Sequence, residues 1–116
     1  MTHIGDPVVW NRTIYRGSDM SWVTRRVDSD GNPLIPTQAN AQIRDTFGGT
    51  VWLDIAGTID PVEGWITLSI SDTATLAPEW DTRVRGVWDL EVVYGGDRLR
   101  WTMGQVLVSQ DVTRGA

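Results

Sequence analysis

The stretch that decides the fold is VRGVWDLEVVYGGDRLRWTMGQVLVS, residues 84–109. Apolar and polar side chains alternate through its first half. The alternation places Trp88, Leu90 and Val92 on one side and Asp89 and Glu91 on the other. A period of two is typical of a β-strand with one buried face, and the two glycines that follow fit a tight hairpin turn. The stretch therefore predicts two antiparallel strands, at 84–94 and 98–109.

Similar short alternating segments recur along the chain, separated by turn residues. We expect these further strands at 8–16, 20–28, 39–45, 50–55 and 64–70. The segment 71–78 begins with Ser-Asp and stops at a proline, which predicts one short helical turn. This pattern predicts an all-β chain, an immunoglobulin-like β-sandwich of about seven to eight antiparallel strands.

The alternation breaks in two strands. In 98–109, the apolar residues change from odd to even positions around Gly104, and a glycine at such a change suggests a β-bulge. In 20–28, Arg26 falls on the side of Met20 and Trp22, and a bulge near Arg25–Arg26 would restore the alternation. We therefore expect irregular pairing at both places.

The chain has 116 residues, which favours a single domain over 1–116 with flexible termini at 1–7 and 110–116. It has no cysteine, so disulfides and thiolate metal sites are excluded. We see no signal peptide at the N-terminus and no apolar run of the roughly 18 residues that a membrane span needs. The net charge is −5, and every basic residue is arginine. Because nucleic-acid binding requires a basic stripe, we expect no nucleic-acid partner.

The run Asp28-Ser-Asp-Gly-Asn32 resembles part of a calcium loop. An EF-type loop needs a glutamate at its twelfth position, but the twelfth residue here is Ala39, and the flanking segments are not helical. Asp-Gly followed by Asn-Pro is instead suited to a hairpin turn, since glycine accepts a positive φ. We interpret the run as a turn and expect no metal or other cofactor.

Two other arrangements of residues bear on catalysis. The one histidine, His3, lies near the terminus, where it is poorly placed for a preorganised Ser-His-Asp unit. Asp89 and Glu91 share a strand face about 7 Å apart, near the separation of glycosidase carboxylates. Alternate acids on a solvated strand are more often solubilising residues. The sequence therefore favours a protein that is not an enzyme.

Seven tryptophans are many for a chain of this length. Trp22, Trp88 and Trp101 fall on predicted inner faces and are expected in the core. Trp52 and Trp65 fall on predicted outer faces of neighbouring strands, where they could pair across the ladder. Either a partner subunit covers them, or the N-terminal arm with Trp10 or the loop with Trp80 does. These four tryptophans, Trp52, Trp65, Trp10 and Trp80, are the candidate interface.

The order of several short motifs resembles a known group of domains. The motifs are YRGSDMSW, VDSDGNP, AQIRD, GGTVWLD, GWITLSI and VWDLEV, between Ile14 and Val108. Their order is similar to that of the N-terminal domain of phage baseplate upper proteins and the LtfC-like β-sandwich of phages infecting actinobacteria. Thr24 and Arg26 stand where that pattern has apolar residues, and Trp65 where it has a polar one.

The resemblance implies a non-enzymatic bacteriophage virion protein, a tail, fibre or baseplate-associated assembly module made in the host bacterial cytoplasm. Its partners would be other virion proteins or further copies of itself, for example in a trimer. The alternative is a carbohydrate- or receptor-binding sandwich used in host attachment, because exposed tryptophans beside polar residues suit sugar binding.

Overall fold

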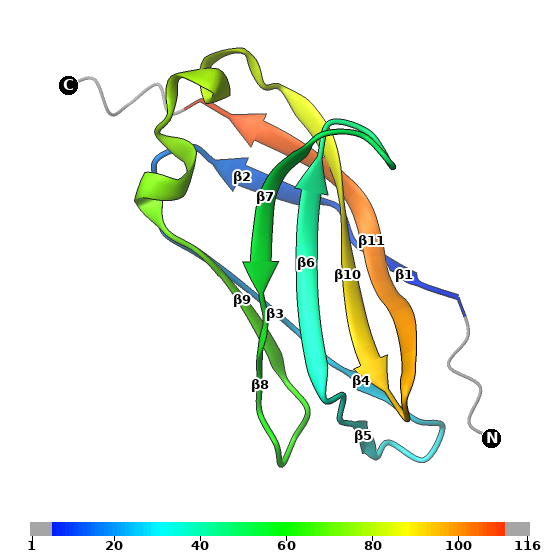
Figure 1. Ribbon diagram of the computed structural model, residues 1–116. Helices are drawn as coiled ribbons and strands as arrows, with labels where there is room; N and C mark the ends of the chain where they lie inside the picture. The colour runs from blue at the N-terminus through cyan, green and yellow to red at the C-terminus, as the bar shows by residue number, and fades with distance from the viewer. Residues whose placement is uncertain (1–5, 111–116) are drawn as a thin grey trace.

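The computed structural model describes residues 6–110, which form eleven β-strands and two 3₁₀-helical turns (Figure 1). The larger sheet has the order β1-β11-β10-β6-β7, and β2 also pairs with β11. Its strands are β1 (Val8–Val9), β2 (Arg12–Tyr15), β6 (Gln38–Arg44), β7 (Val51–Ala56), β10 (Arg85–Tyr94) and β11 (Asp97–Ser109). The smaller sheet has the order β3-β9-β8. Its strands are β3 (Met20–Thr24), β8 (Thr58–Ile59) and β9 (Ile66–Ile70).

The two sheets form a sandwich with immunoglobulin-like strand order, as predicted. The order β11-β10-β6-β7 opposite β3-β9-β8 corresponds to strands G-F-C-C′ opposite B-E-D of a variable-type domain. A separate two-stranded ribbon, β4 (Arg26–Val27) and β5 (Pro33–Leu34), lies at the lower end in Figure 1. All seven predicted strand segments contain strands, which confirms the all-β fold class.

The core lies between the inner faces that the alternation predicted. β6, β9 and β10 each bury every second side chain. The buried side chains of these strands include Ala39, Ala41, Ile43, Ile66, Leu68, Ile70, Trp88, Leu90 and Val92. The Trp22 ring of β3 meets the Trp88 ring of β10 edge-on, with centroids 5.1 Å apart. This contact joins the two sheets where an antibody domain has its B–F disulfide.

The predicted first strand, 8–16, is divided into β1 and β2, and both run parallel to β11. This pairing differs from the purely antiparallel arrangement expected. Between β1 and β2, the chain crosses β11 closely: the Trp10 amide donates to the Met103 carbonyl at 2.8 Å, and Asn11 Oδ1 accepts the Gln105 amide at 2.9 Å. A Cβ on Gly104 would lie 2.3 Å from the Trp10 carbonyl oxygen. Gly104 therefore permits this crossing.

The bulge expected at Gly104 is three residues earlier. Leu90 pairs with Thr102 and Glu91 with Arg100, which leaves Trp101 without a partner on β10. Trp101 and Thr102 are consecutive and both buried. Gly104 itself pairs regularly with Trp88, so the bulge assignment to Gly104 was wrong.

The second predicted strand, 20–28, is interrupted near the expected irregularity. β3 ends at Thr24, and β4 begins at Arg26 but pairs with β5 rather than with the small sheet. The chain thus leaves the small sheet at Arg25, although Leu34 of β5 still belongs to the core.

The connection between β9 and β10 contains two 3₁₀ turns, η1 (Asp72–Thr75) and η2 (Pro78–Thr82), where one turn ending at Pro78 was expected. Pro78 begins the second turn, a position that needs no backbone N–H. Arg16 holds this connection in place, because its guanidinium donates to the carbonyls of Thr75, Leu76 and Ala77 at 2.9–3.2 Å. The same group donates to Gln110 Oε1 at 3.0 Å and forms an ion pair with Asp81.

Residues 1–5 and 111–116, which make up most of the termini predicted to be flexible, lie outside the described residues. His3 is among them. Gln110, the first residue of the predicted C-terminal segment, donates through Nε2 to the Trp80 carbonyl at 2.8 Å.

Candidate functional site

Trp80, a member of the predicted interface, belongs to the core, and Trp52, a second member, is partly buried against it. Trp80 is 2% exposed, and Trp52 packs edge-on against it at 5.7 Å. The pairing of β6 with β7 shifts register between Ile43 and Arg44, so Trp52 has no partner on β6. Trp52 packs beside Gly86 on the inner side of β10, where a Cβ on Gly86 would meet the Trp52 ring at 2.7 Å. The prediction of an outward Trp52 was wrong because strand alternation cannot reveal this bulge.

Trp65 is exposed, as predicted, but it does not pair with Trp52. β7 pairs with β6 in the large sheet, whereas Trp65 precedes β9, with its carbonyl accepting the Asp60 amide at 2.8 Å. The Trp65 side chain is 40% exposed, and the Arg25 guanidinium lies 4.4 Å from the ring centroid. Trp65 therefore remains the exposed member of the four candidates.

Trp10 is half-buried at the edge of the core. Its ring lies 6.1 Å from that of Trp88, and its carbonyl accepts the Trp88 Nε1–H at 2.7 Å. The Arg12 guanidinium covers the other part of the ring at 4.1 Å. These contacts give Trp10 a structural role in fastening the N-terminal strands.

The Asp28–Asn32 run is the turn between β4 and β5, as interpreted from the sequence. Asp28 Oδ1 accepts the amides of Asp30 and Asn32 at 2.9 Å, and Gly31 has a φ of 85°. The Asn32 amide is the main group that holds the pKa of Asp28 below its ordinary value. Among residues 6–110, no cluster of three or more His, Asp or Glu side chains is placed to hold a metal ion.

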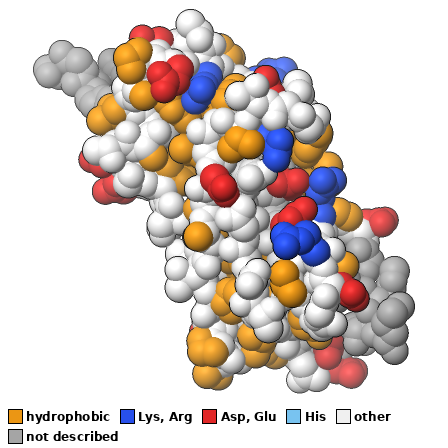
Figure 2. All heavy atoms as spheres, in the orientation of Figure 1, with side chains coloured by type: hydrophobic (Ala, Val, Ile, Leu, Met, Phe, Trp, Pro, Cys, Tyr) orange, Lys and Arg blue, Asp and Glu red, His pale blue; other side chains and the backbone are white. Residues whose placement is uncertain are grey.

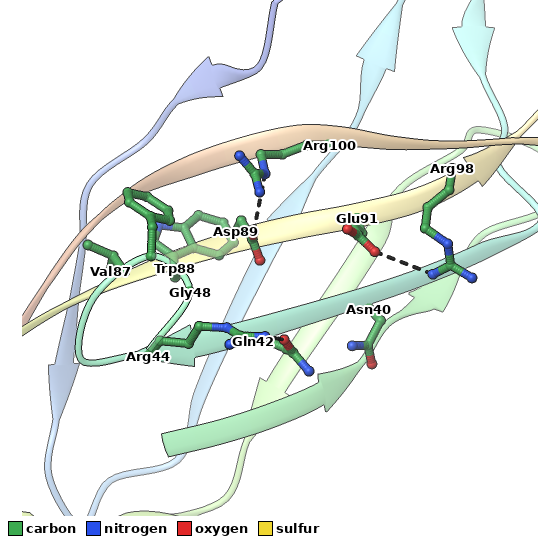
Figure 3. Close-up of a pocket in the computed structure, with 11 residues that line it drawn as sticks. Asn40, Gln42, Arg44, Gly48, Val87, Trp88, Asp89, Glu91, Arg98 and Arg100 are labelled. Carbon is green, nitrogen blue, oxygen red and sulfur yellow. Dashed lines mark hydrogen bonds and ion pairs between the residues drawn. The ribbon is translucent and has the colours of Figure 1, made fainter. Parts of the chain in front are cut away.

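A polar hollow of about 330 Å³ lies on the open face of the large sheet (Figure 3). β6, β10 and β11 place alternate side chains outward on this face, because their other side chains fill the core. The polar groups that line it from β6, β10 and β11 include Asn40, Gln42, Arg44, Asp89, Glu91 and Arg100. Figure 2 shows arginine and acidic side chains gathered over the same strands.

The charges in this hollow are paired across neighbouring strands. Arg100 Nε lies 3.2 Å from Asp89 Oδ2, and Arg98 Nη1 donates to Glu91 Oε1 at 3.3 Å. Arg44 donates to the Gly49 carbonyl at 2.9 Å and also to Gln42 Oε1. Each carboxylate of the Asp89–Glu91 pair is thus held by its own arginine, as the dashed lines in Figure 3 show.

Burial raises the pKa of the Asp89 carboxyl above its ordinary value. The nearby Arg100 acts in the opposite direction, the negative charge of Glu91 adds to the rise, and Arg44 again opposes it. The ionised form of Asp89 is therefore disfavoured by its surroundings despite the ion pair. A carboxylate in a hollow with a perturbed pKa is a candidate functional group.

A second hollow of about 470 Å³ adjoins the first. It extends toward the beginning of β6 and is lined by residues that include Thr37, Gln38, Gly57 and Ile59. Both hollows share Asn40, Glu91 and Arg98 in their lining.

The alternation of polar residues along two strands is a sequence signal for this site. The sequence predicted strands at 39–45 and 84–94, the second with Asp89 and Glu91 opposite its apolar residues, and the structure places these two strands side by side. The row on β6 is Asn40, Gln42 and Arg44. Polar residues of one parity on two paired strands form a continuous polar face. Phe47 and Gly48 could not be foreseen, because the loop between β6 and β7 folds them to the hollow.

No helix within residues 6–110 has the length and apolar character that crossing a membrane requires. No protein-family model matches the chain. The curated proteins contain no significant match either. Among solved structures, a chain from work on multimeric cell-adhesive interactions of VGSC beta subunits is similar at 9% identity. That match covers 96% of this chain and 100% of the other, with a TM-score of 0.49, and transfers no function.

Proposed function

We propose that the chain is a non-enzymatic structural module of a bacteriophage particle, associated with the tail, fibre or baseplate. The observation that supports this proposal is the order of the motifs in the resemblance. Each motif occupies a defined strand or turn of the sandwich, from the turn before β3 to strand β10. The paired charges on the open face also suit contact better than proton transfer, since neither Asp89 nor Glu91 stands apart from an arginine.

The partners in this proposal are other virion proteins or further copies of the chain. Trp65 is the candidate contact residue, together with the exposed Val62 of the same hairpin, which is 71% exposed. Figure 2 shows hydrophobic side chains at the tip of the hairpin between β8 and β9. Large aromatic side chains are enriched among residues that dominate binding energy, which favours this end as the contact surface.

The test has two parts. Mass spectrometry of purified particles of the phage that encodes the chain should detect it in stoichiometric amounts. Particles carrying Trp65→Ala should contain less of the protein, whereas Val84→Ala, an exposed apolar control near η2, should leave its content unchanged. Absence of the protein from wild-type particles would refute the virion assignment, and equal incorporation of both variants would refute the role of Trp65.

A second candidate function is carbohydrate or receptor binding for host attachment. The polar hollow on the open face of the large sheet favours it, because ligand sites combine a concave surface with a few oriented polar groups.

A further inference from the structure

The two hollows on the large sheet form one elongated groove. They share Asn40 of β6, Glu91 of β10 and Arg98 of β11, so the two hollows adjoin along these residues on the same face of the sheet. The Glu91–Arg98 ion pair lies at the junction. A groove of this kind suits an extended ligand with repeated polar groups better than a compact one.

The backbone beneath the groove cannot take part in strand pairing with a ligand. β6 is bonded to β7 on one side and β10 on the other, and β10 is bonded to β6 and β11. A peptide that binds by adding a strand needs an open sheet edge, and this groove lies across the middle of the sheet. Recognition must therefore come from side chains.

The side chains offer many hydrogen bonds but little net charge. Three arginines in the first hollow accompany two acidic residues, and Asp54 beside them accepts a hydrogen bond from Asn40 at 2.7 Å. Arg98 and Arg100 each have further guanidinium N–H groups beyond the one that holds a carboxylate. Planar amide, guanidinium and carboxylate groups bind neighbouring hydroxyls in pairs. An uncharged ligand rich in hydroxyl groups matches this lining.

An apolar ring completes the lining. Phe47 is 48% exposed at the border of the first hollow, on the loop between β6 and β7. An exposed aromatic ring beside hydrogen-bonding groups can pack against the apolar face of a sugar ring. Asp89 adds a further argument, because burial raises its pKa and its charge is thus retained at a cost to stability.

We propose that this groove binds an extended, uncharged saccharide chain, with the outward side chains of β6 and β10 hydrogen-bonding to its hydroxyl groups. The proposal rests on the second candidate function and is independent of whether the chain is part of a virion. It names the outward row Asn40, Gln42, Asp89 and Glu91 as the recognition residues and Phe47 as the stacking residue.

The purified full chain should be tested on an array of uncharged and anionic bacterial cell-wall oligosaccharides. We expect binding to extended uncharged members, with little dependence on salt because few charges are neutralised. Gln42→Ala and Asp89→Asn should each weaken binding by about tenfold, the loss expected for a hydrogen bond to a ligand. Ser69→Ala, on the outer face of the small sheet, should bind like the wild type.

A nuclear magnetic resonance titration with the best oligosaccharide locates the site independently. Shifts should concentrate on amides of β6 and β10 and spare β3 and β9. The proposal is overturned if no uncharged oligosaccharide binds, if only anionic ones bind, or if Gln42→Ala and Asp89→Asn both bind normally. It is also overturned if light scattering shows a dimer that Gln42→Ala dissociates, since the face would then be a protein interface. The particle measurement above is unaffected by any of these results.

Discussion

At the residue scale, Arg16 holds in place the long irregular connection between β9 and β10. Arg16 is only 16% exposed at its side chain and binds three successive carbonyls between η1 and η2. The carbonyls of Thr75 and Leu76 lie outside the strand ladders and would lose this donor without Arg16, whereas the Ala77 carbonyl also accepts the Trp80 amide at 3.0 Å. A single side chain thus donates the hydrogen bonds that backbone amides donate to carbonyls within the strands.

We expect Arg16→Ala to lower the free energy of unfolding by about 2–4 kcal/mol, because it removes the donor that the Thr75 and Leu76 carbonyls and Gln110 Oε1 share. Arg16→Lys should recover less than half of the loss, since an ammonium cannot reproduce the planar set of donors. Urea unfolding followed by tryptophan fluorescence measures both. An equal stability for Arg16→Lys and wild type would show that charge alone suffices.

The raised pKa of Asp89 predicts a stability that depends on pH. A carboxyl with a higher pKa in the folded than in the unfolded state binds its proton more tightly when folded. Ionised Asp89 therefore destabilises the fold above its folded pKa, and the effect disappears below its unfolded pKa. Asp89→Asn should be more stable than the wild type at neutral pH, and the difference should shrink as the pH falls. Unfolding curves at a series of pH values would reveal the opposite trend if Arg100 dominates.

At the scale of the strand, sequence alternation predicted faces well wherever pairing was regular. Trp88, Leu90 and Val92 of β10 are buried as expected, and Ile66, Leu68 and Ile70 of β9 follow the same alternation. It failed at Trp52, where the pairing of β6 with β7 skips a residue. At Trp101 the buried face was predicted correctly, but the bulge was assigned to Gly104. A bulge depends on two strands at once, so the pattern within one strand cannot locate it. The polar face of the groove could be predicted from parity, but its loop residues could not.

The bulge in β7 makes two tryptophan substitutions unequal. Trp52→Ala should cost about 3 kcal/mol of unfolding free energy, because it removes a ring packed against Trp80 and leaves a cavity. Trp65→Ala should cost less than about 1 kcal/mol, since its ring is partly in solvent. Thermal and urea unfolding of the two variants measure both losses of unfolding free energy. Comparable losses would mean that Trp65 is more important to the fold than its exposure indicates.

The crossing of the N-terminal strands over β11 depends on Gly104. Gly104→Ala should destabilise the fold by about 1–3 kcal/mol, because its methyl group would overlap the Trp10 carbonyl. The Trp88 indole N–H, which donates to that carbonyl, should lose protection from hydrogen exchange. Gly31→Ala serves as a control, because a Cβ at Gly31 would have no neighbour within 4 Å. This variant should lower the free energy of unfolding only through the positive φ of Gly31 and should leave the exchange of the Trp88 indole N–H unchanged. An unchanged Trp88 signal in Gly104→Ala would contradict the close crossing.

At the scale of the whole molecule, the sandwich was predictable from strand spacing, but the role of its last strand was not. β11 pairs with β10 along most of its length and also with β1 and β2. Parallel pairing of the first and last strands brings together segments that no local pattern connects.

A chain ending at Gly96, which lacks β11, should therefore remain unfolded. It would lose Trp101, Val106 and Val108 from the core as well as every partner of β1 and β2. Circular dichroism in the aromatic region should show no native signal, and adding a peptide of residues 97–116 should restore part of it. A cooperative unfolding transition for the shortened chain alone would show that the remaining strands suffice.

The pairing of β1 and β2 with β11 has a consequence for biosynthesis. β1 and β2 are synthesised before β11, their pairing partner, so they remain unpaired until residues 97–109 have left the ribosome. Closure of the domain is then a late event that follows synthesis of residues 97–109. During that interval the nascent chain exposes apolar strands, and rapid translation of residues 97–109 would shorten the period in which these strands can aggregate.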